Sequence, residues 1–93
     1  MKKVSNSHYS KNFEKMFRKA PVKIQKAFVE KAKLLINNVN NPTLNNHQLH
    51  GHYKGYRSIN ITGDWRALYT ETQSHGEIIA YFEFLGTHSE LYK

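Results

Sequence analysis

The 93-residue chain has no cysteine and 39% hydrophobic residues, which fits one small domain over residues 1–93 and excludes disulfides and thiolate metal sites. No apolar run approaches the ~20 residues of a membrane span, so we expect a cytoplasmic protein without a signal peptide. The formal charge is +7, and residues 1–34 hold 10 basic side chains against 2 acidic ones. This excess favours a polyanionic partner, although a solvated lysine-rich helix face explains it equally well.

Two helices are expected in the first half of the chain, after a short strand over residues 4–8. Ser10 suits the N-cap of the first helix, because its hydroxyl can accept a hydrogen bond from the first turn. Apolar residues then recur at helical spacing at Phe13, Met16, Phe17 and Ala20. Pro21 suits the first position of a second helix, and the asparagine-rich run 37–42 ends that helix. An antiparallel helical pair with a basic outer face is the expected result.

The second half of the chain changes to the alternating pattern of β-strands. Residues 43–54 are polar and histidine-rich, and we expect them to form a loop. Three alternating segments, joined by short turns, cover residues 56–62, 65–69 and 77–85. Because the helices precede this antiparallel meander, we expect an α+β fold with a helical hairpin packed on one face of a mainly antiparallel sheet.

Several kinds of site find little support in the sequence. The loop histidines His47, His50 and His52 invite a zinc interpretation, but no cysteine or acidic residue stands near them to complete a tetrahedral shell. The chain has neither a glycine-rich phosphate loop nor a serine-nucleophile elbow. Asp64 is its only aspartate. We therefore expect neither a metal nor a cofactor.

The remaining mix of histidine, arginine, aspartate and tyrosine suits metal-free cleavage of RNA. The reaction needs a base for the 2′-hydroxyl proton, an acid for the leaving 5′-oxygen, and cations for the charge that develops on phosphorus. Histidine can fill either proton-transfer role, because it titrates near neutrality. Arginine stays charged and contacts two phosphate oxygens at once, and an aromatic ring can stack on an unpaired base.

Three segments carry a resemblance to a known family: HQLHG (47–51), GYRSINITGDWRALY (55–69) and LGTHSELY (85–92). In combination they resemble the RelE/ParE superfamily of toxin–antitoxin toxins, and within it the YafQ-like mRNA interferases. The resemblance implies a β-α-α-β-β-β fold and a cognate antitoxin that neutralises the toxin. It also implies ribosome-dependent cleavage of mRNA in the 30S A site, with contacts to ribosomal RNA.

The resemblance also assigns roles to individual residues. His47, Asp64 and His88 fall on the catalytic positions of that branch. Trp65 falls on a neighbouring aromatic position and Tyr92 on a terminal one, both of which contact substrate in the family. The chain departs from the pattern where the branch often has a second histidine in the strand before the aspartate. Asn60 stands there, and it can hydrogen-bond a substrate but cannot transfer a proton near neutral pH.

The tail and the arginines admit two interpretations each. We expect residues 86–87 to turn the chain so that His88 returns over the site, with Leu91 pinning the tail to the core. Otherwise His88 and Tyr92 would merely pack the chain end. Arg57 and Arg66 could bind phosphate or be ordinary surface groups. Arg57 alternates in phase with apolar residues, which suits the sheet edge, and Arg66 could pair with Glu77 or Glu83 across the hairpin. Trp65 could equally belong to the core.

The leading functional prediction is an mRNA interferase toxin, with Arg57, Asn60, Trp65, Arg66 and Tyr92 contacting the substrate. One alternative is a non-nucleolytic toxin that binds DNA gyrase, like the ParE branch, for which no convergent titratable groups are needed. A second alternative is a catalytically degenerate protein that only binds its antitoxin and regulates its own operon. The replacement of a histidine by Asn60 gives this second alternative some weight.

Overall fold

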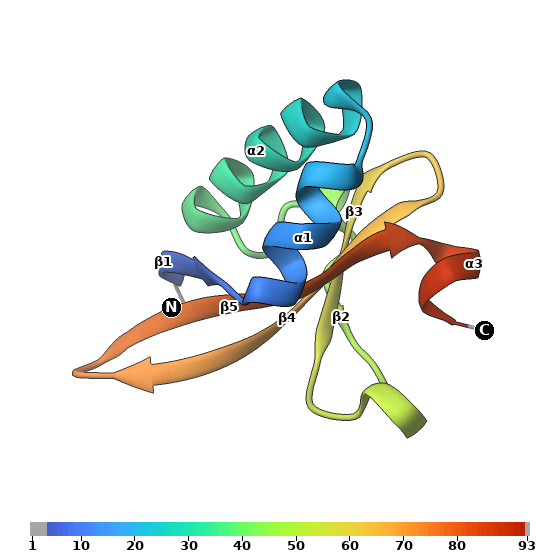
Figure 1. Ribbon diagram of the computed structural model, residues 1–93. Helices are drawn as coiled ribbons and strands as arrows, with labels where there is room; N and C mark the ends of the chain where they lie inside the picture. Colours follow the sequence, from blue (N-terminus) through green and yellow to red (C-terminus); the bar gives the residue numbers. More distant parts are fainter. Residues whose placement is uncertain (1–3, 93) are drawn as a thin grey trace.

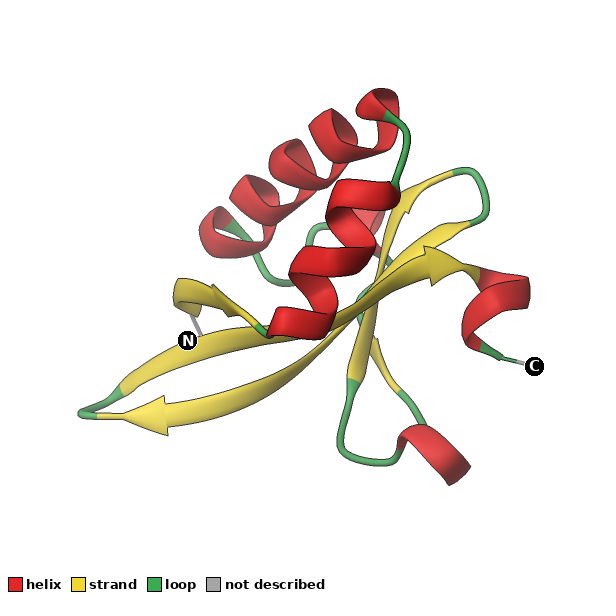
Figure 2. Ribbon diagram, in the orientation of Figure 1, coloured by secondary structure: helices red, strands yellow, loops and turns green. Residues whose placement is uncertain are grey.

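The computed structural model of the protein describes residues 4–92. A first strand leads into two helices, after which the chain builds the other strands and ends in one helical turn (Figure 1). The elements are β1 (Val4–Tyr9), α1 (Lys11–Lys19), α2 (Val22–Asn37), η1 (Pro42–Leu44), β2 (His47–Gln48), η2 (Gly51–Tyr53), β3 (Arg57–Thr62), β4 (Trp65–Ser74), β5 (Glu77–Thr87) and α3 (His88–Leu91). The helices α1 and α2 lie together on one side of the sheet, and α3 lies at the end of β5 (Figure 2).

Within residues 4–92 the strands form one sheet in the order β1-β5-β4-β3-β2. β1 runs parallel to β5, and the other neighbouring strands are antiparallel. The helical hairpin follows β1 in the sequence and covers one face of the sheet. The strands β2 to β5 come after it in the chain. The prediction of an α+β fold with a mainly antiparallel sheet is therefore confirmed.

Some element boundaries differ from those expected. The segment 43–54 is not only a loop, because β2 pairs with β3 through two residues. β4 extends to Ser74, because its pairing with the start of β5 continues along an exposed hairpin arm, and at the other end β5 extends to Thr87, which pairs with Trp65. His75 and Gly76 close that arm with φ angles of 51° and 78°, the geometry that matches the twist of a hairpin. Pro21 is the N-cap of α2 rather than its first helical residue.

The main core lies between the helical hairpin and the sheet. The ring centroids of Phe13 and Phe28 are 4.9 Å apart, and those of Phe28 and Phe82 are 5.0 Å apart in an edge-to-face contact. Tyr69 joins this cluster from β4 and is fully buried, as expected of a core residue. Ser10 fixes the start of α1, because its Oγ accepts a hydrogen bond from the Phe13 N–H at 3.0 Å.

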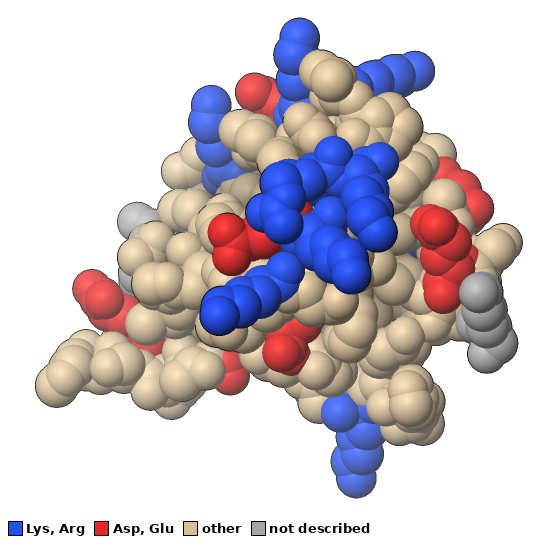
Figure 3. Space-filling model, in the orientation of Figure 1, with Lys and Arg blue, Asp and Glu red and all other residues tan. Residues whose placement is uncertain are grey.

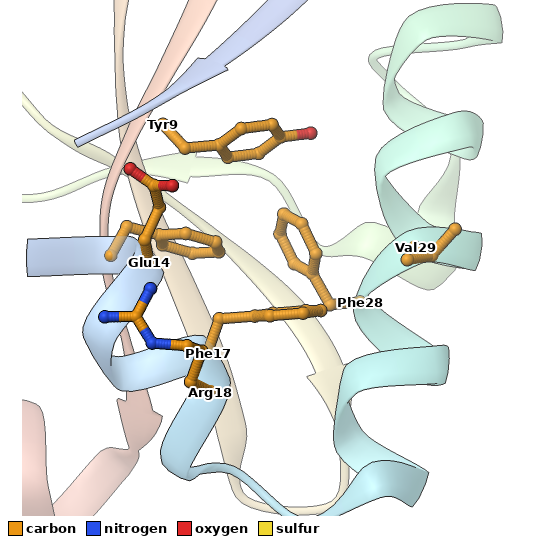
Figure 4. Close-up of a pocket in the computed structure, with 7 residues that line it drawn as sticks. Tyr9, Glu14, Phe17, Arg18, Phe28 and Val29 are labelled. Atoms are coloured by element: carbon orange, nitrogen blue, oxygen red, sulfur yellow. The ribbon is translucent and has the colours of Figure 1, made fainter. Parts of the chain in front are cut away.

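The outer surface of the helical hairpin combines a basic patch with an apolar groove. Exposed basic residues of α1 gather in the middle of Figure 3: Lys11, Lys15, Arg18 and Lys19. Between β1, α1 and α2, aromatic rings line a hollow of about 300 Å³ (Figure 4). Tyr9 and Val29, which also line it, are 42% and 43% exposed.

None of the helices within residues 4–92 combines the length and the hydropathy that a membrane span requires.

A smaller aromatic cluster lies on the opposite face of the sheet. The rings of Tyr53 and Tyr56 each lie 5.6 Å from the ring of Phe84 on β5, and Leu91 of α3 is buried. The Tyr56 hydroxyl donates to Glu83 Oε2 at 2.5 Å, and this bond, followed by burial, raises the pKa of Tyr56 to about 12. The cluster therefore joins the η2 turn and the end of the chain to the face that the helices leave open.

Candidate active site

The open face of the sheet carries polar side chains of β2, β3 and β4. Ser58 lies opposite Leu68, and Asn60 lies opposite Arg66. Directly opposite residues of antiparallel strands point to the same side, so these side chains share one face. His47 of β2 pairs with Ser58 and therefore points to that face as well.

His47 is held by the turn that precedes it. Its Nδ1 lies 2.7 Å from the main-chain oxygen of Asn45, and Asn45 adopts the left-handed conformation with φ 46°, which asparagine tolerates well. A carbonyl oxygen can only accept a hydrogen bond, so the proton of the neutral ring belongs on Nδ1. Nε2 is then the nitrogen with a lone pair, and the exposed ring presents it as a proton acceptor.

The end of the chain reaches the same face through α3. β5 continues through Thr87, so α3 makes the reversal that we expected at residues 86–87. Thr87 caps α3, because its Oγ1 accepts from the Glu90 N–H at 3.2 Å while Glu90 Oε1 accepts from the Thr87 N–H at 2.8 Å. A Cβ at Gly86 would lie 3.3 Å from Glu90 Oε1 and 3.4 Å from Leu91, so the glycine leaves room for the turn. Leu91 is buried, as predicted for the residue that pins the tail.

His88 and Tyr92 stand one helical turn apart at the two ends of α3. Their rings are 4.6 Å apart, and the Tyr92 N–H donates to the His88 carbonyl at 2.9 Å. The two side chains therefore lie side by side on α3. Their orientation over the sheet depends on how α3 is anchored.

The structure brings the histidines of the loop and the tail to one hollow. This hollow has a volume of about 330 Å³ and is lined by Asn45, His47, Leu49, Ser58, Arg66, His88 and Tyr92. Of the residues that the sequence singled out, it gathers His47, Arg66, His88 and Tyr92. Two imidazoles, a guanidinium and a phenol thus face one space.

Two buried polar atoms on this face have no hydrogen-bond partner among the described residues, and only that of Ser58 belongs to a residue that lines the hollow. Ser58 is 1% exposed, and among the described residues neither its Oγ nor the buried Oδ1 of Asn60 has a hydrogen-bond partner. Arg66 donates from Nη1 to the carbonyls of Gly63 and Trp65 at 2.9 and 3.0 Å. It does so in place of the expected pairing across the hairpin with Glu77 or Glu83, because its neighbours there are Asn60 and Gly86.

Asp64 lies beside this hollow without lining it. It occupies the β3–β4 turn, its side chain is exposed, and its carbonyl accepts a hydrogen bond from the His88 N–H at 2.9 Å. The main chain of Asp64 thereby anchors the start of α3. The three predicted proton-transfer residues lie on one side of the molecule, with two of them facing the same space.

Arg57 and Trp65 belong to the other face. Arg57 lies opposite the buried Tyr69, and its Nε donates to Asn46 Oδ1 at 2.7 Å. Asn46 in turn donates from Nδ2 to the Tyr69 hydroxyl at 2.7 Å, and burial raises the pKa of that hydroxyl to about 12. Trp65 packs against the main core. Neither side chain lines the hollow of His47 and His88.

Several residues that support the site do not belong to the motifs from which it was predicted. Asn45 and Asn46 fix the loop before His47, and their position directly ahead of a candidate histidine was the available signal. Tyr53 donates from its hydroxyl to the Leu91 carbonyl at 2.7 Å, a long-range contact that no local pattern indicates. Among the described residues, no three histidine or acidic side chains converge as a metal site would require.

Comparison with solved structures shows the class of fold to which this chain belongs. The YoeB/ParE toxin from Agrobacterium tumefaciens has the same fold, with a TM-score of 0.72 at 15% identity over 95% of this chain and 99% of that one. The chain therefore has the fold of the RelE/ParE toxins, as the resemblance predicted.

The family within this class follows from a match over the whole chain. Residues 1–93 match the family described as bacterial toxin of type II toxin–antitoxin system, YafQ, and the protein belongs to that family. The crystal structure of YafQ from E. coli strain BL21(DE3) is similar, with 27% identity and a TM-score of 0.77 over 94% of this chain and 97% of that one. YafQ in the E. coli DinJ–YafQ toxin–antitoxin complex is 26% identical, with a TM-score of 0.72 over 97% and 100% of the two chains. No curated protein sequence matches the chain.

Proposed function

We propose that this type II toxin is a ribosome-dependent endoribonuclease that cleaves mRNA by metal-free acid/base catalysis and so inhibits translation. The observation that carries the proposal is the hollow in which His47 and His88 meet Arg66 and Tyr92. His47 and His88 come from segments far apart in the sequence. A toxin that acted only by binding would not need two imidazoles at one space.

The proposed reaction assigns one proton transfer to each histidine. His47 takes the proton of the 2′-hydroxyl on Nε2, because its Nδ1 is held by the Asn45 carbonyl. The 2′-oxygen then attacks phosphorus and forms a 2′,3′-cyclic phosphate. The bond from phosphorus to the 5′-oxygen breaks, and His88 donates a proton to that leaving oxygen.

Other side chains around the hollow suit binding of the reacting nucleotide. Arg66 lines the hollow, and its guanidinium stabilises the negative charge that develops on phosphorus. The Tyr92 ring offers a stacking surface for an unpaired base. Asn60 does not line the hollow but lies opposite Arg66 on the same face, and it offers its buried amide oxygen to the substrate as a hydrogen-bond acceptor. Asp64 is the third proposed catalytic residue. It lies in the β3–β4 turn, where its carbonyl holds the His88 N–H.

The partners follow from the charge and from the family. The exposed basic residues of α1 (Figure 3) suit ribosomal RNA, since each contact with a phosphate releases counterions. A cognate antitoxin is the second expected partner, because YafQ from E. coli forms a toxin–antitoxin complex with DinJ. Because ribosomes are cytoplasmic in bacteria, the proposal includes a cytoplasmic location.

The proposal is tested by mapping the 5′ ends of transcripts after brief induction. We expect the unmodified protein to create new ends within translated reading frames, and His88→Ala to create none. His8→Ala is the matched control, because His8 is an exposed histidine of β1 outside the hollow, and it should cleave as the unmodified protein does. A His47→Ala, His88→Ala double variant that still arrests growth would favour gyrase binding instead. A folded protein that leaves ribosome-bound mRNA uncut would favour a degenerate regulator.

A further inference from the structure

We propose that Tyr53 is a positioning residue that sets the place of His88 and Tyr92 over the hollow, an inference that rests on the proposed nuclease function. α3 is a helix of four residues, far below the length at which a helix is stable by itself. Contacts with the rest of the molecule must therefore hold it. These contacts decide where the two functional rings of the tail lie.

The anchors of α3 are distributed along its length. At its start, the His88 N–H is held by the Asp64 carbonyl at 2.9 Å, and Thr87 provides the cap. In its last turn, the Leu91 side chain is 6% exposed and fixes the helix against the sheet. None of these three contacts involves the main chain at the exit of the helix toward Tyr92.

Tyr53 supplies the contact at the end of α3. The last carbonyls of a helix have no partner within the helix, and the Leu91 carbonyl accepts a hydrogen bond from the Tyr53 hydroxyl at 2.7 Å. The Tyr53 ring also stands edge-on to the Tyr92 ring, at 5.6 Å and an interplanar angle of 89°. One side chain therefore contacts both the main chain and the ring at the exit of α3.

Tyr53 can act in this way because it is itself fixed to the sheet. Its ring packs on Phe84 of β5 and on Tyr56, at 5.6 and 6.0 Å. Its carbonyl accepts a hydrogen bond from the Tyr56 N–H at 3.0 Å, and the Tyr56 hydroxyl is bonded to Glu83 of β5. Tyr53 therefore holds Tyr92 at a defined place relative to the sheet. Tyr92 in turn contacts His88, with the two rings 4.6 Å apart.

Tyr53→Phe separates this role from general stability, because it removes the hydroxyl and keeps the ring. We expect single-turnover cleavage at saturating ribosome concentration to slow by about three- to tenfold, the factor that one lost hydrogen bond represents. We expect the apparent affinity for the ribosome to stay unchanged, since Tyr53 lies outside the basic patch of α1. Tyr9→Phe is the matched control, because the Tyr9 hydroxyl is also bonded, to Ser7 Oγ at 2.9 Å, but lies on β1.

NMR of the free protein gives a readout that does not depend on cleavage. In Tyr53→Phe, the ring signals of His88 and Tyr92 should shift, and exchange of the Tyr92 amide should accelerate several-fold. The unfolding midpoint should stay close to that of Tyr9→Phe. Unchanged signals and exchange would overturn the proposal, and so would a displaced tail combined with unchanged cleavage by an active protein. If the unmodified protein itself leaves mRNA uncut, the nuclease function fails, while the NMR comparison still decides whether Tyr53 fixes the tail.

Discussion

Asn46→Ala should destabilise the protein by removing the link between the η1–β2 turn and the buried face of the sheet. The Asn46 amide accepts from Arg57 Nε at 2.7 Å and donates to the Tyr69 hydroxyl at 2.7 Å. Tyr69 has no exposed surface, so water cannot replace the lost donor without opening the core. Arg57 is half-buried and can recover part of its hydration.

The expected cost follows from these two bonds. A neutral hydrogen bond to a buried group contributes about 1 kcal/mol, and a bond to a charged group contributes about 1.5 kcal/mol or more. Partial hydration of Arg57 lowers the second value, so we expect the free energy of unfolding to fall by about 2 kcal/mol. Asn40→Ala is the control, because Asn40 is an exposed residue of the same segment, and it should change stability by less than about 0.5 kcal/mol.

Urea unfolding of the single and double variants measures both the cost and its origin. The midpoint should fall without a change in the slope. When Tyr69 is first changed to phenylalanine, Asn46→Ala should cost about 1 kcal/mol less, because the shared bond is already absent. An Asn46→Ala variant as stable as Asn40→Ala, or costs that add in the double variant, would refute this description of the network.

Three further predictions concern titration and capping. Glu83→Ala should lower the pKa of Tyr56 from about 12 toward its ordinary 10.0, because it removes the carboxylate whose hydrogen bond is the main cause of the shift; NMR titration of the tyrosine rings measures it, and an unchanged pKa would exclude that cause. Burial raises the pKa of Tyr69 from 10.0 to about 12, so the stability linked to its proton is complete below pH 10 and is lost as the pH rises toward 12. At pH 11 the loss due to Tyr69 should be ~1.4 kcal/mol relative to pH 9, measured by urea unfolding as the difference between the unmodified protein and Tyr69→Phe, because the raised pKa of Tyr56 acts in both proteins; an equal loss in the two proteins would assign it to other groups. Thr87→Ala should remove the cap on the Glu90 N–H and weaken α3 by about 1 kcal/mol, seen as faster exchange of that amide, whereas unchanged exchange would mean that the cap adds nothing.

Much of the fold could be predicted because its local patterns agree with its tertiary contacts. The stripe that contains Phe13 does face the core, and the Ser10 cap forms as expected. β2 could not be predicted, since two residues carry no periodicity and exist as a strand only through their pairing with β3. α3 was missed for a related reason, because its stability depends on Leu91, Tyr53 and the Thr87 cap rather than on its own length.

The structure gathers some of the predicted site residues at one hollow and leaves others outside it, and the sheet explains which ones lie outside. His47 and His88 were identified by their motifs, and the structure places both on one hollow. Arg57 was listed with the substrate contacts, although its alternation with Ile59 already placed it on the face that the helices cover. Trp65 lies beside an irregularity between Asn60 and Thr62, where the register that assigns side chains to faces shifts. Such a shift depends on pairing between strands and has no signature within either strand.

The central claim is that His47 and His88 act on the same phosphodiester. Single-turnover cleavage of ribosome-bound mRNA by the unmodified protein, His47→Ala, His88→Ala and the double variant tests it most directly. We predict that each single change lowers the rate at least ~100-fold and that the double change lowers it little further, because an acid and a base that serve one step lose their effect together. Cleavage by either single variant at the rate of the unmodified protein would contradict the claim.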